Sequence, residues 1–555
     1  MPLCLLIAGL LLVSCASDPP QPAESTAAPA QTIPPSPTST AMATVPPTST
    51  PTVPPTSTPP PTLTPEPTPS YPVLTLEPED RMMQVYPGPP HYQGDVLIFE
   101  INAGRRVEEG EAEVTLQLDG GYLYEVQGEW DRQFLRFPFD TEELIGEHRL
   151  EINARQNYVN INRSYSFEIL PASQRPAQEE DAAWVSRELE CCTLHYITDT
   201  AAARDIEPLS RTVREAVDGF QSDLQVEVQD RLDIYFIDRM WFNGAFGGPG
   251  ELLIVYTDRF YGPTLGLEGV KTLVRHELGH AVFSHFSFNE GLCVYAAGGH
   301  YTPHPIPQRA AAMLELGYYD PERGTPRRHE TKYLYQAGVV NYIIEAYGWE
   351  GLRAFMEADN ADGDAFSEAA RDKLFNQTLG LSREAFYEDY VDWLRSQDPG
   401  EQLEDLELTV ELQELRREYQ DRYERWPWML FGWAEETFAR PEYLRVNIRE
   451  PRTPAHIATE LLIADAQRAL MDDRYQEVEK LIPVIEDIVD TGRLAHPLAR
   501  EYGNVVYALA EEGYETVGLE LHGARAEATV TASPPELEAV TLRKENGRWL
   551  LDRPR

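Results

Sequence analysis

A tract made almost entirely of proline, threonine, serine and alanine runs from Pro19 to about Ser70. Folded domains are expected only outside this tract. Such residues cannot bury a core, and the many prolines favour an extended, polyproline-like conformation. At about 3.1 Å per residue, the tract could hold its two ends on the order of 150 Å apart. We therefore predict a stalk over residues 16–70 and a folded part that begins near Tyr71.

The segment before the stalk, MPLCLLIAGLLLVSC, resembles the signal peptide of a bacterial lipoprotein. Its apolar run is too short to span a bilayer, and its last four residues, LVSC, are similar to a lipobox. The resemblance implies that residues 1–15 are the signal and that lipid on Cys15 anchors the protein on the extracytoplasmic side of the cell membrane. An ordinary cleaved signal and a short buried helix are the alternatives, and no Lys or Arg precedes the apolar run.

The size and charge of the chain restrict its organisation and its partners. Its 555 residues are too many for one hydrophobic core, so several domains are expected. The chain carries 91 acidic and 47 basic residues, a formal net charge of −44. A surface of this sign repels phosphate, which argues against a nucleic-acid partner.

Three cysteines remain in the folded part: Cys191, Cys192 and Cys293. Adjacent cysteines do not easily bridge each other, because their spacing is shorter than a disulfide prefers. Either one of the adjacent pair is therefore joined to Cys293, or all three are buried thiols.

The expected fold class is multidomain α+β. Apolar and polar residues alternate with period two in several short runs between residues 71 and 175, which predicts an immunoglobulin-like β-sandwich without a chemical motif. Residues 176–398 combine three short strand patterns with long helical ones, and residues 399–450 are expected to be a helical linker. Residues 451–555 pair helices with closing strands around an Asn546-Gly547 hairpin. This last domain resembles nuclear-transport-factor-like and SnoaL-like folds.

The strongest chemical signal is the segment KTLVRHELGHAVF, which contains His276, Glu277 and His280. Histidines four apart on a helix project from one face at a distance suitable for chelating a metal. Zinc prefers imidazole and carboxylate ligands, and a neighbouring carboxylate can act as general base toward a metal-activated water. Apolar residues at helical spacing flank the motif, which indicates a buried helix. The sequence therefore predicts a catalytic zinc site.

A second carboxylate, Glu290, follows ten residues after His280 within Phe288-Asn289-Glu290-Gly291-Leu292, at the start of another probable helix. A catalytic zinc ion takes three protein ligands and leaves one position for water. We predict that Glu290 is the third ligand of one zinc ion.

Residues from about 193 to 394 resemble the gluzincin metallopeptidases, specifically the peptidase MA-like branch related to M1-type aminopeptidases. The resemblance implies a small mixed sheet, an HExxH helix, an N-E-G-L helix and a helical lobe, with His276, His280 and Glu290 as zinc ligands and Glu277 as general base. The nine residues between His280 and Glu290 are fewer than the family usually has, so a tight turn is expected there. His285 is expected to lie on the surface or at the edge of the core.

The resemblance also implies a tyrosine that stabilises the transition state. Tyr335 starts a Tyr-x-x-Gly segment that matches the family's tyrosine, with Tyr333, Tyr295 and His329 as other candidates. For Tyr335 the alternative role is an ordinary core aromatic.

The predicted function is a membrane-anchored zinc peptidase acting on peptide or protein substrates. The Gly-rich turn before Glu251 to Thr257 suggests that this strand lies beside the cleft and pairs with an extended substrate, although a plain hairpin loop is equally consistent. The Gly-x-Met-Glu-Asn element of aminopeptidases is lacking, which favours an endopeptidase. The alternatives are an inactive metallopeptidase fold that acts as a binding or scaffold lipoprotein, and a zinc hydrolase of non-protein amides.

Overall fold

The computed structural model describes residues 71–107, 110–121, 123–131, 133–156, 159–228, 231–238, 244–262, 266–283, 286–300, 304–326, 328–361, 368–424, 444–448, 453–532 and 536–552. All of them belong to one compact unit, Pro67–Arg555. The predicted signal, the stalk and the anchor Cys15 lie outside the described residues, as does His285. Among the helices that the structure describes, none combines the length and the apolar character that crossing a membrane requires.

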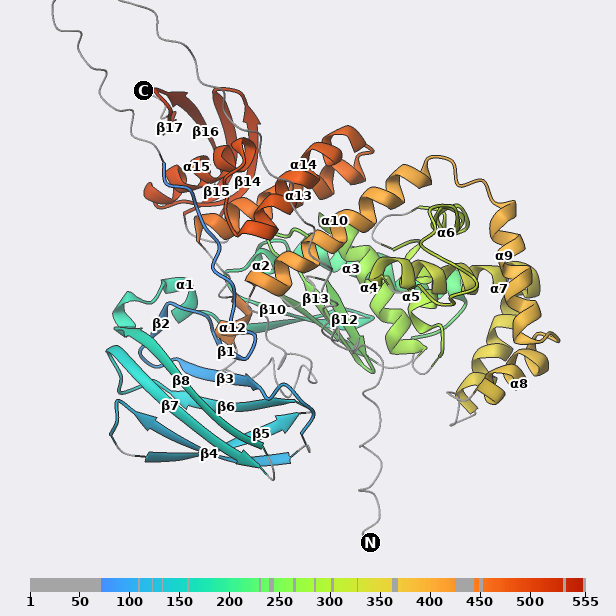
Figure 1. Ribbon diagram of the computed structural model, residues 1–555, viewed down its shortest axis with the longest axis horizontal. Helices are drawn as coiled ribbons and strands as arrows, with labels where there is room; N and C mark the ends of the chain where they lie inside the picture. Colours follow the sequence, from blue (N-terminus) through green and yellow to red (C-terminus); the bar gives the residue numbers. More distant parts are fainter. Residues whose placement is uncertain are drawn as a thin grey trace, which may run out of the picture. The chain divides into compact units, whose positions relative to one another are not determined.

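The N-terminal domain is built on one large curled sheet of eight strands (Figure 1). The strands are β1 (Met83–Tyr86), β2 (His91–Tyr92), β3 (Val96–Asn102), β4 (Gly110–Leu118), β5 (Leu123–Asp131), β6 (Phe134–Asp140), β7 (Gly146–Gln156) and β8 (Val159–Leu170). Their order across the sheet is β1-β3-β6-β5-β4-β7-β8-β2.

The curl of this sheet brings its two ends together around one core. The rings of Phe99 on β3 and Tyr165 on β8 meet edge to face with centroids 5.4 Å apart, although these strands are not hydrogen-bonded neighbours. The period-two pattern therefore correctly predicted strands with one buried face. The expected pair of separate sheets was wrong, because the hydrogen bonding between strands is continuous from β1 to β2.

The central domain contains a small mixed sheet, as the sequence predicted. Its order is β12-β13-β11-β10-β9, from β9 (Trp184–Glu188), β10 (Cys192–Ile197), β11 (Leu232–Ile237), β12 (Ala245–Gly248) and β13 (Glu251–Val255). The three inner strands are parallel, and the two edge strands run antiparallel to their neighbours. Apolar residues of α3 (Ile206–Leu224) and α4 (Gly266–Val282) share a core with the inner strands.

Helices make up the rest of the central domain. They are α5 (Asn289–Ala297), α6 (Ile306–Glu315), α7 (His329–Ala361), α8 (Glu368–Thr378) and α9 (Arg383–Ser396), with the short α1 (Ala177–Glu180) and α2 (Ala201–Arg204) nearer its start. The longest, α7, bends at Gly348, whose φ of 72° lies in the left-handed region that glycine adopts readily. A separate aromatic-rich core joins α5, α6, α7, α8 and α9.

The C-terminal part places helices on a four-stranded sheet. It comprises α10 (Gln402–Tyr423), α12 (Leu444–Ile448), α13 (Pro454–Met471), α14 (Tyr475–Thr491), α15 (Pro497–Glu511), β14 (Glu515–His522), β15 (Arg525–Thr531), β16 (Glu538–Glu545) and β17 (Arg548–Leu551). Asn546 and Gly547 form the predicted hairpin turn, both with positive φ. The helix expected in the linker segment is present as α10, and its apolar residues lie in the same core as those of α13, α14 and α15.

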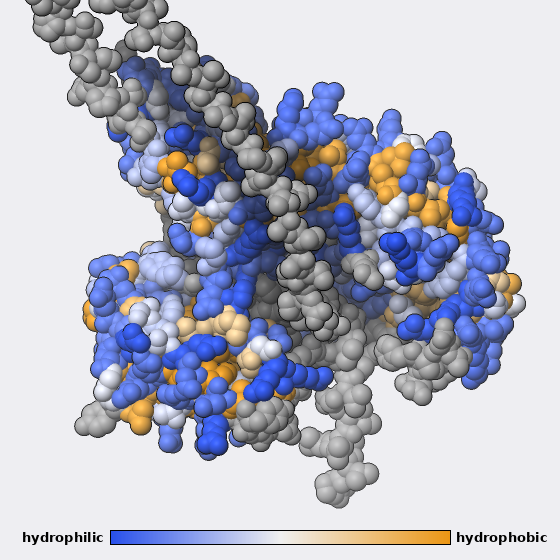
Figure 2. All heavy atoms as spheres, viewed as in Figure 1, coloured by the Kyte–Doolittle hydropathy of each residue, from blue (hydrophilic) through white to orange (hydrophobic). Residues whose placement is uncertain are grey.

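The surface is mainly hydrophilic on the face shown in Figure 2, where apolar residues occur in scattered patches. This distribution agrees with the charge of −44 in the sequence. Most of the large apolar side chains of the described residues are buried in the cores described above.

A buried ion pair ties the central sheet to the C-terminal domain. Arg259, which follows β13, donates from Nε to Glu460 on α13 at 2.8 Å and from Nη1 to Glu515 on β14 at 2.6 Å. The side chains of Arg259 and Glu460 are only 2% and 0% exposed. Because charges at such depth are costly to leave unpaired, this contact couples the two domains.

We expect the substitution Arg259→Met to destabilise the protein by about 3–5 kcal/mol, since it leaves the buried carboxylate of Glu460 without its guanidinium. The free energy of unfolding from urea denaturation would measure the loss. Arg543→Met is the control, because that side chain is 53% exposed and its surface ion pair should contribute about 0–1 kcal/mol. Equal stability of the two variants would contradict the coupling.

Candidate metal site

Helix α4 carries the HExxH motif on one face and core residues on the other. Val270, Val274 and Leu278 recur every four residues and are buried against α3 and the central sheet. Arg275 holds the helix on two sides, through Asp223 of α3 at 2.6 Å and the backbone carbonyl of Ala296 in α5 at 2.7 Å. These contacts determine which face of α4 turns toward α5.

The carboxylate of Glu290 lies close to both predicted histidine ligands. Glu290 Oε2 lies 3.4 Å from His276 Nε2 and 3.3 Å from His280 Nε2, and the three side chains are 12–15% exposed. In a tetrahedral zinc site with bonds of about 2.0–2.1 Å, neighbouring ligand atoms are about 3.4 Å apart. The two distances from Glu290 and the chemistry of the three donors are compatible with a zinc ion.

Close crossing of helices brings Glu290 to the histidines across the short connection. A Cβ added at Gly279 of α4 would lie 2.5 Å from Cys293 Sγ in α5, and one at Gly291 would overlap the backbone of α7 at Gln336. The turn before α5 is held by Asp359, whose carboxylate accepts from the Ser287 amide at 2.6 Å and from its hydroxyl at 2.9 Å. Glycine at both crossings is what permits this approach.

The electrostatic surroundings shift the pKa values of the three predicted ligands in different directions. Burial lowers the pKa of His276 to about 4, so its imidazole is neutral and able to act as a ligand. Burial by itself would raise the pKa of Glu290, but the two histidines outweigh it and hold that pKa well below the usual range. Burial by itself would lower the pKa of His280, but the neighbouring Cys293 and Glu290 outweigh it and raise that pKa well above the usual range. A metal ion bound at His280 would therefore have to displace a proton from this imidazole.

Behind His280 lie Asn289 and Cys293 of α5. Asn289 Nδ2 lies 3.1 Å from His280 Nδ1, and Cys293 Sγ lies 3.6 Å from Asn289 Oδ1. A histidine that binds metal through Nε2 carries its proton on Nδ1 and donates it to an outer partner, so the amide oxygen of Asn289 would face Nδ1 in the metal-bound form.

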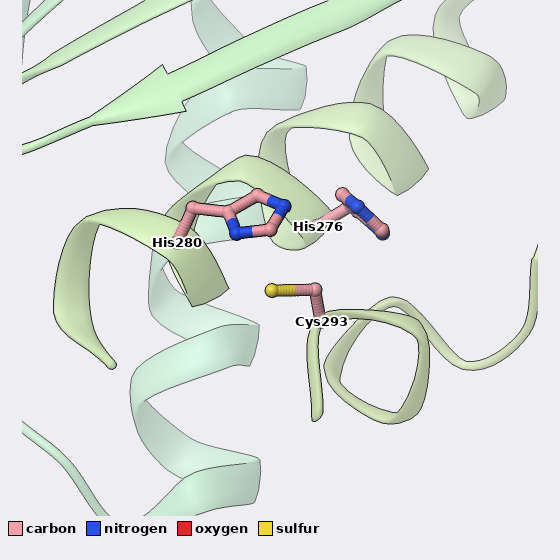
Figure 3. Close-up of side chains that lie close together, drawn as sticks. All are labelled: His276, His280 and Cys293. Carbon is pink, nitrogen blue, oxygen red and sulfur yellow. The ribbon is translucent and has the colours of Figure 1, made fainter. Parts of the chain in front are cut away.

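Cys293 is the member of this cluster that the sequence analysis did not assign to the site. One ligand atom each from His276, His280 and Cys293 lies within 4.8 Å of the others, and the thiol points toward the side of His280 from the neighbouring helix (Figure 3). Cys293 follows Glu290 by three residues, which places both side chains on one face of the helix. This spacing was the sequence feature that could have indicated Cys293 as part of the site.

The predicted general base, Glu277, lies under the edge of the central sheet. Its side chain is 5% exposed, and burial raises its pKa to about 7, while a hydrogen bond from the Gly247 amide opposes the rise. A Cβ at Gly247 would lie 2.9 Å from Glu277 Oε2. The edge strand beside the site is therefore β12; the segment expected at the edge, β13, is an inner strand of the sheet.

The structure does not bring Tyr335 to the histidines. Its ring lies in the helical core, with its centroid 5.0 Å from that of Tyr319 and 6.1 Å from that of Tyr390. Tyr333, two residues earlier on α7, lies with its ring centroid 6.1 Å from that of His276. A rotation of about 200° between such positions places them on opposite sides of a helix.

Tyr333 is the middle ring of a stack beside the site. The ring of His300 lies 4.5 Å from one side of Tyr333, and that of His329 lies 4.6 Å from the other. His300 Nδ1 is paired with the buried carboxylate of Glu330 at 2.7 Å. Arg417 of α10 donates to His329 Nδ1 at 2.6 Å. The stack is thus held at both ends by charged groups.

No protein-family model matches the chain, and no curated protein does. A crystal structure of an aminopeptidase N family protein from Idiomarina loihiensis aligns over 59% of this chain and 75% of its own, at 8% sequence identity and a TM-score of 0.18. A variant of Salmonella alpha-2-macroglobulin aligns over 82% of this chain, which spans only 28% of that protein, at 10% identity and a TM-score of 0.11. Likeness this weak carries no argument, so the site must be interpreted from its own geometry.

The environment of His329 predicts a loss of stability in acid. Burial, followed by the charge of Arg417, lowers the pKa of His329 to about 2. Below its unfolded pKa of about 6.5, only the unfolded chain takes up this proton, so the stabilisation is complete above that pH and is lost as the pH falls. The loss between pH 7 and pH 5 should be about 2 kcal/mol.

His329→Gln removes this titration, so the difference in unfolding free energy between wild type and variant should shrink by about 2 kcal/mol from pH 7 to pH 5 in urea denaturation. His522→Gln, at the exposed end of β14, is the control and should follow the wild type. A difference that does not change with pH would mean that His329 takes up a proton in the folded protein.

Proposed function

We propose that this chain is a zinc-dependent peptidase. The observation that carries the proposal is that Glu290 Oε2 lies 3.4 Å from His276 Nε2 and 3.3 Å from His280 Nε2, with Glu277 on the helix of the two histidines. A zinc ion held by these three side chains would supply Lewis acidity and make a water acidic enough to react near neutral pH.

In the proposed reaction, Glu277 takes a proton from the attacking water and passes it to the leaving amine. A general base works best when its pKa lies near the working pH, and the burial of Glu277 favours such a value. The hydrogen bond from Gly247 holds the carboxylate in place without making it a ligand. This division of roles separates proton transfer from metal binding.

Charge develops on the carbonyl oxygen of the scissile bond and needs a donor. The ring contact of Tyr333 with His276 favours Tyr333 for this role over Tyr335, and the stacked rings of His300 and His329 limit its movement. The packing of Tyr335 with Tyr319 and Tyr390 supports the alternative that it is a core aromatic.

The substrate is proposed to be a peptide bound in extended form along β12. This strand lies at the edge of its sheet and directly above Glu277, where a peptide could add as a further strand. Its sequence, AFGG, has no acidic residue to hold a free N-terminus, which favours an endopeptidase. Lipid on Cys15 and the stalk over residues 16–70 would hold the enzyme outside the cytoplasmic membrane.

The substitution Glu277→Gln tests the chemistry. It should abolish cleavage of casein and of a peptide library while one zinc ion per chain remains bound, because the base is not a ligand. Glu290→Ala is the matched variant and should lose metal together with activity. Elemental analysis and cleavage assays with and without a chelator give both quantities.

If the Glu277→Gln variant cleaved these substrates at the wild-type rate, Glu277 would not be the general base. Wild-type protein that binds zinc and cleaves none of these substrates would support the alternatives of a scaffold or of a hydrolase for other amides.

A pair of tyrosine variants tests the oxyanion donor. Tyr333→Phe should lower kcat roughly a hundredfold with little change in KM, the result of losing a hydrogen bond made only in the transition state. Tyr335→Phe, on the same helix, is the control and should keep kcat within a few-fold. Steady-state kinetics on one cleaved peptide would measure both, and the reverse result would return the role to Tyr335.

A further inference from the structure

Two adjacent cysteines lie where the turn after β9 enters β10, with Cys191 in the turn and Cys192 as the first residue of β10. Thr193 pairs with Glu188 across the hairpin, and the Leu189 amide donates to the Cys192 carbonyl at 2.8 Å, so residues 189–192 make a tight turn. Within this turn Cys191 Sγ and Cys192 Sγ lie 2.6 Å apart. Non-bonded heavy atoms keep about 3.5–4 Å, and a disulfide bond is about 2.05 Å long. The turn therefore brings the sulfurs closer than two independent thiols would lie.

The third cysteine has different surroundings. Cys293 contacts Asn289 and lies beside His280 in the candidate metal site, on α5. Cys192, by contrast, is wholly buried in the core between the central sheet and α3. Among the described residues all three cysteines are free, in agreement with the alternative of three thiols, and the two sulfurs in contact are the adjacent ones.

The two thiols differ in access and acidity. Cys191 is partly exposed, whereas Cys192 is 0% exposed. The hydrogen bond with Cys192 lowers the pKa of the Cys191 thiol, and Arg214 acts in the same direction. The same hydrogen bond raises the pKa of Cys192. Cys191 is thus the thiol that an external oxidant would reach first.

We propose that Cys191 and Cys192 form a vicinal disulfide and that this turn is a thiol–disulfide modification site. The co-reactant is a disulfide R–S–S–R, from a small thiol or an oxidoreductase. The Cys191 thiolate attacks one of its sulfurs and expels RS⁻, and the Cys192 thiolate then attacks Cys191 and expels the second RS⁻. The cysteine pair loses two electrons and two protons, and the co-reactant becomes two thiols.

The bridge is expected to be reversible. Consecutive Cα atoms are about 3.8 Å apart, less than the roughly 4.4–6.8 Å that disulfides prefer, so ring closure strains the turn. Strained bridges are more easily reduced, which is typical of labile rather than structural disulfides. The inference does not depend on the proposed peptidase activity.

Peptide mapping of the folded chain tests the proposal. The full protein is incubated with glutathione disulfide, then denatured and alkylated with N-ethylmaleimide without reductant. The tryptic peptide of residues 188–204 should carry no alkyl group and weigh two hydrogens less than the dithiol form. After reduction, the same peptide should take two alkyl groups.

Two variants distinguish a bridge between Cys191 and Cys192 from a bridge to Cys293. Cys191→Ser should leave one cysteine in this peptide that is alkylated, or joined to glutathione, before reduction. Cys293→Ser should leave the wild-type result unchanged. Two alkyl groups on the unreduced wild-type peptide, or a cross-link from it to the peptide that holds Cys293, would overturn the proposal.

Discussion

The close crossing of α4 and α5 is the constraint on which the candidate site depends. Gly279 lets the thiol of Cys293 lie against α4, and Gly291 lets α5 lie against the backbone of α7. A larger residue at either position would push Glu290 away from the two histidines. Asp359 holds the turn at Ser287, which helps Glu290 to reach the histidines although only nine residues separate it from His280. Helix packing, rather than a long loop, thus assembles the three donors.

The edge strand β12 determines the character of Glu277. The sheet covers the carboxylate closely enough to raise its pKa to about 7, and the Gly247 amide supplies one hydrogen bond that keeps it oriented. Gly247 also has no Cβ to obstruct Glu277 Oε2. One strand therefore buries the proposed base, orients it and forms the edge of the described sheet, where we propose that a peptide binds.

The aromatic residues of α7 show how one helix can serve two purposes. Tyr335 and Tyr390 belong to the core that holds the helical lobe together, whereas Tyr333 faces His276 between two stacked imidazoles. Charged groups from α10 and from α7 itself hold those imidazoles. The C-terminal helices thus contribute to the stack beside the candidate metal site as well as to the buried ion pair at Arg259.

The sequence by itself determined the residues that share a helical face and the segments that form strands, because periodicity and ligand spacing are local properties. It therefore predicted His276, His280 and Glu290 together, the mixed sheet and most of the helices. Tertiary packing decided the rest. Whether Tyr333 or Tyr335 faces the site depends on the rotation of α7 against its neighbours. Whether the strands make one curled sheet or two, and whether β12 or β13 is the edge, depends on hydrogen bonds between segments that are distant in sequence, which local patterns do not encode.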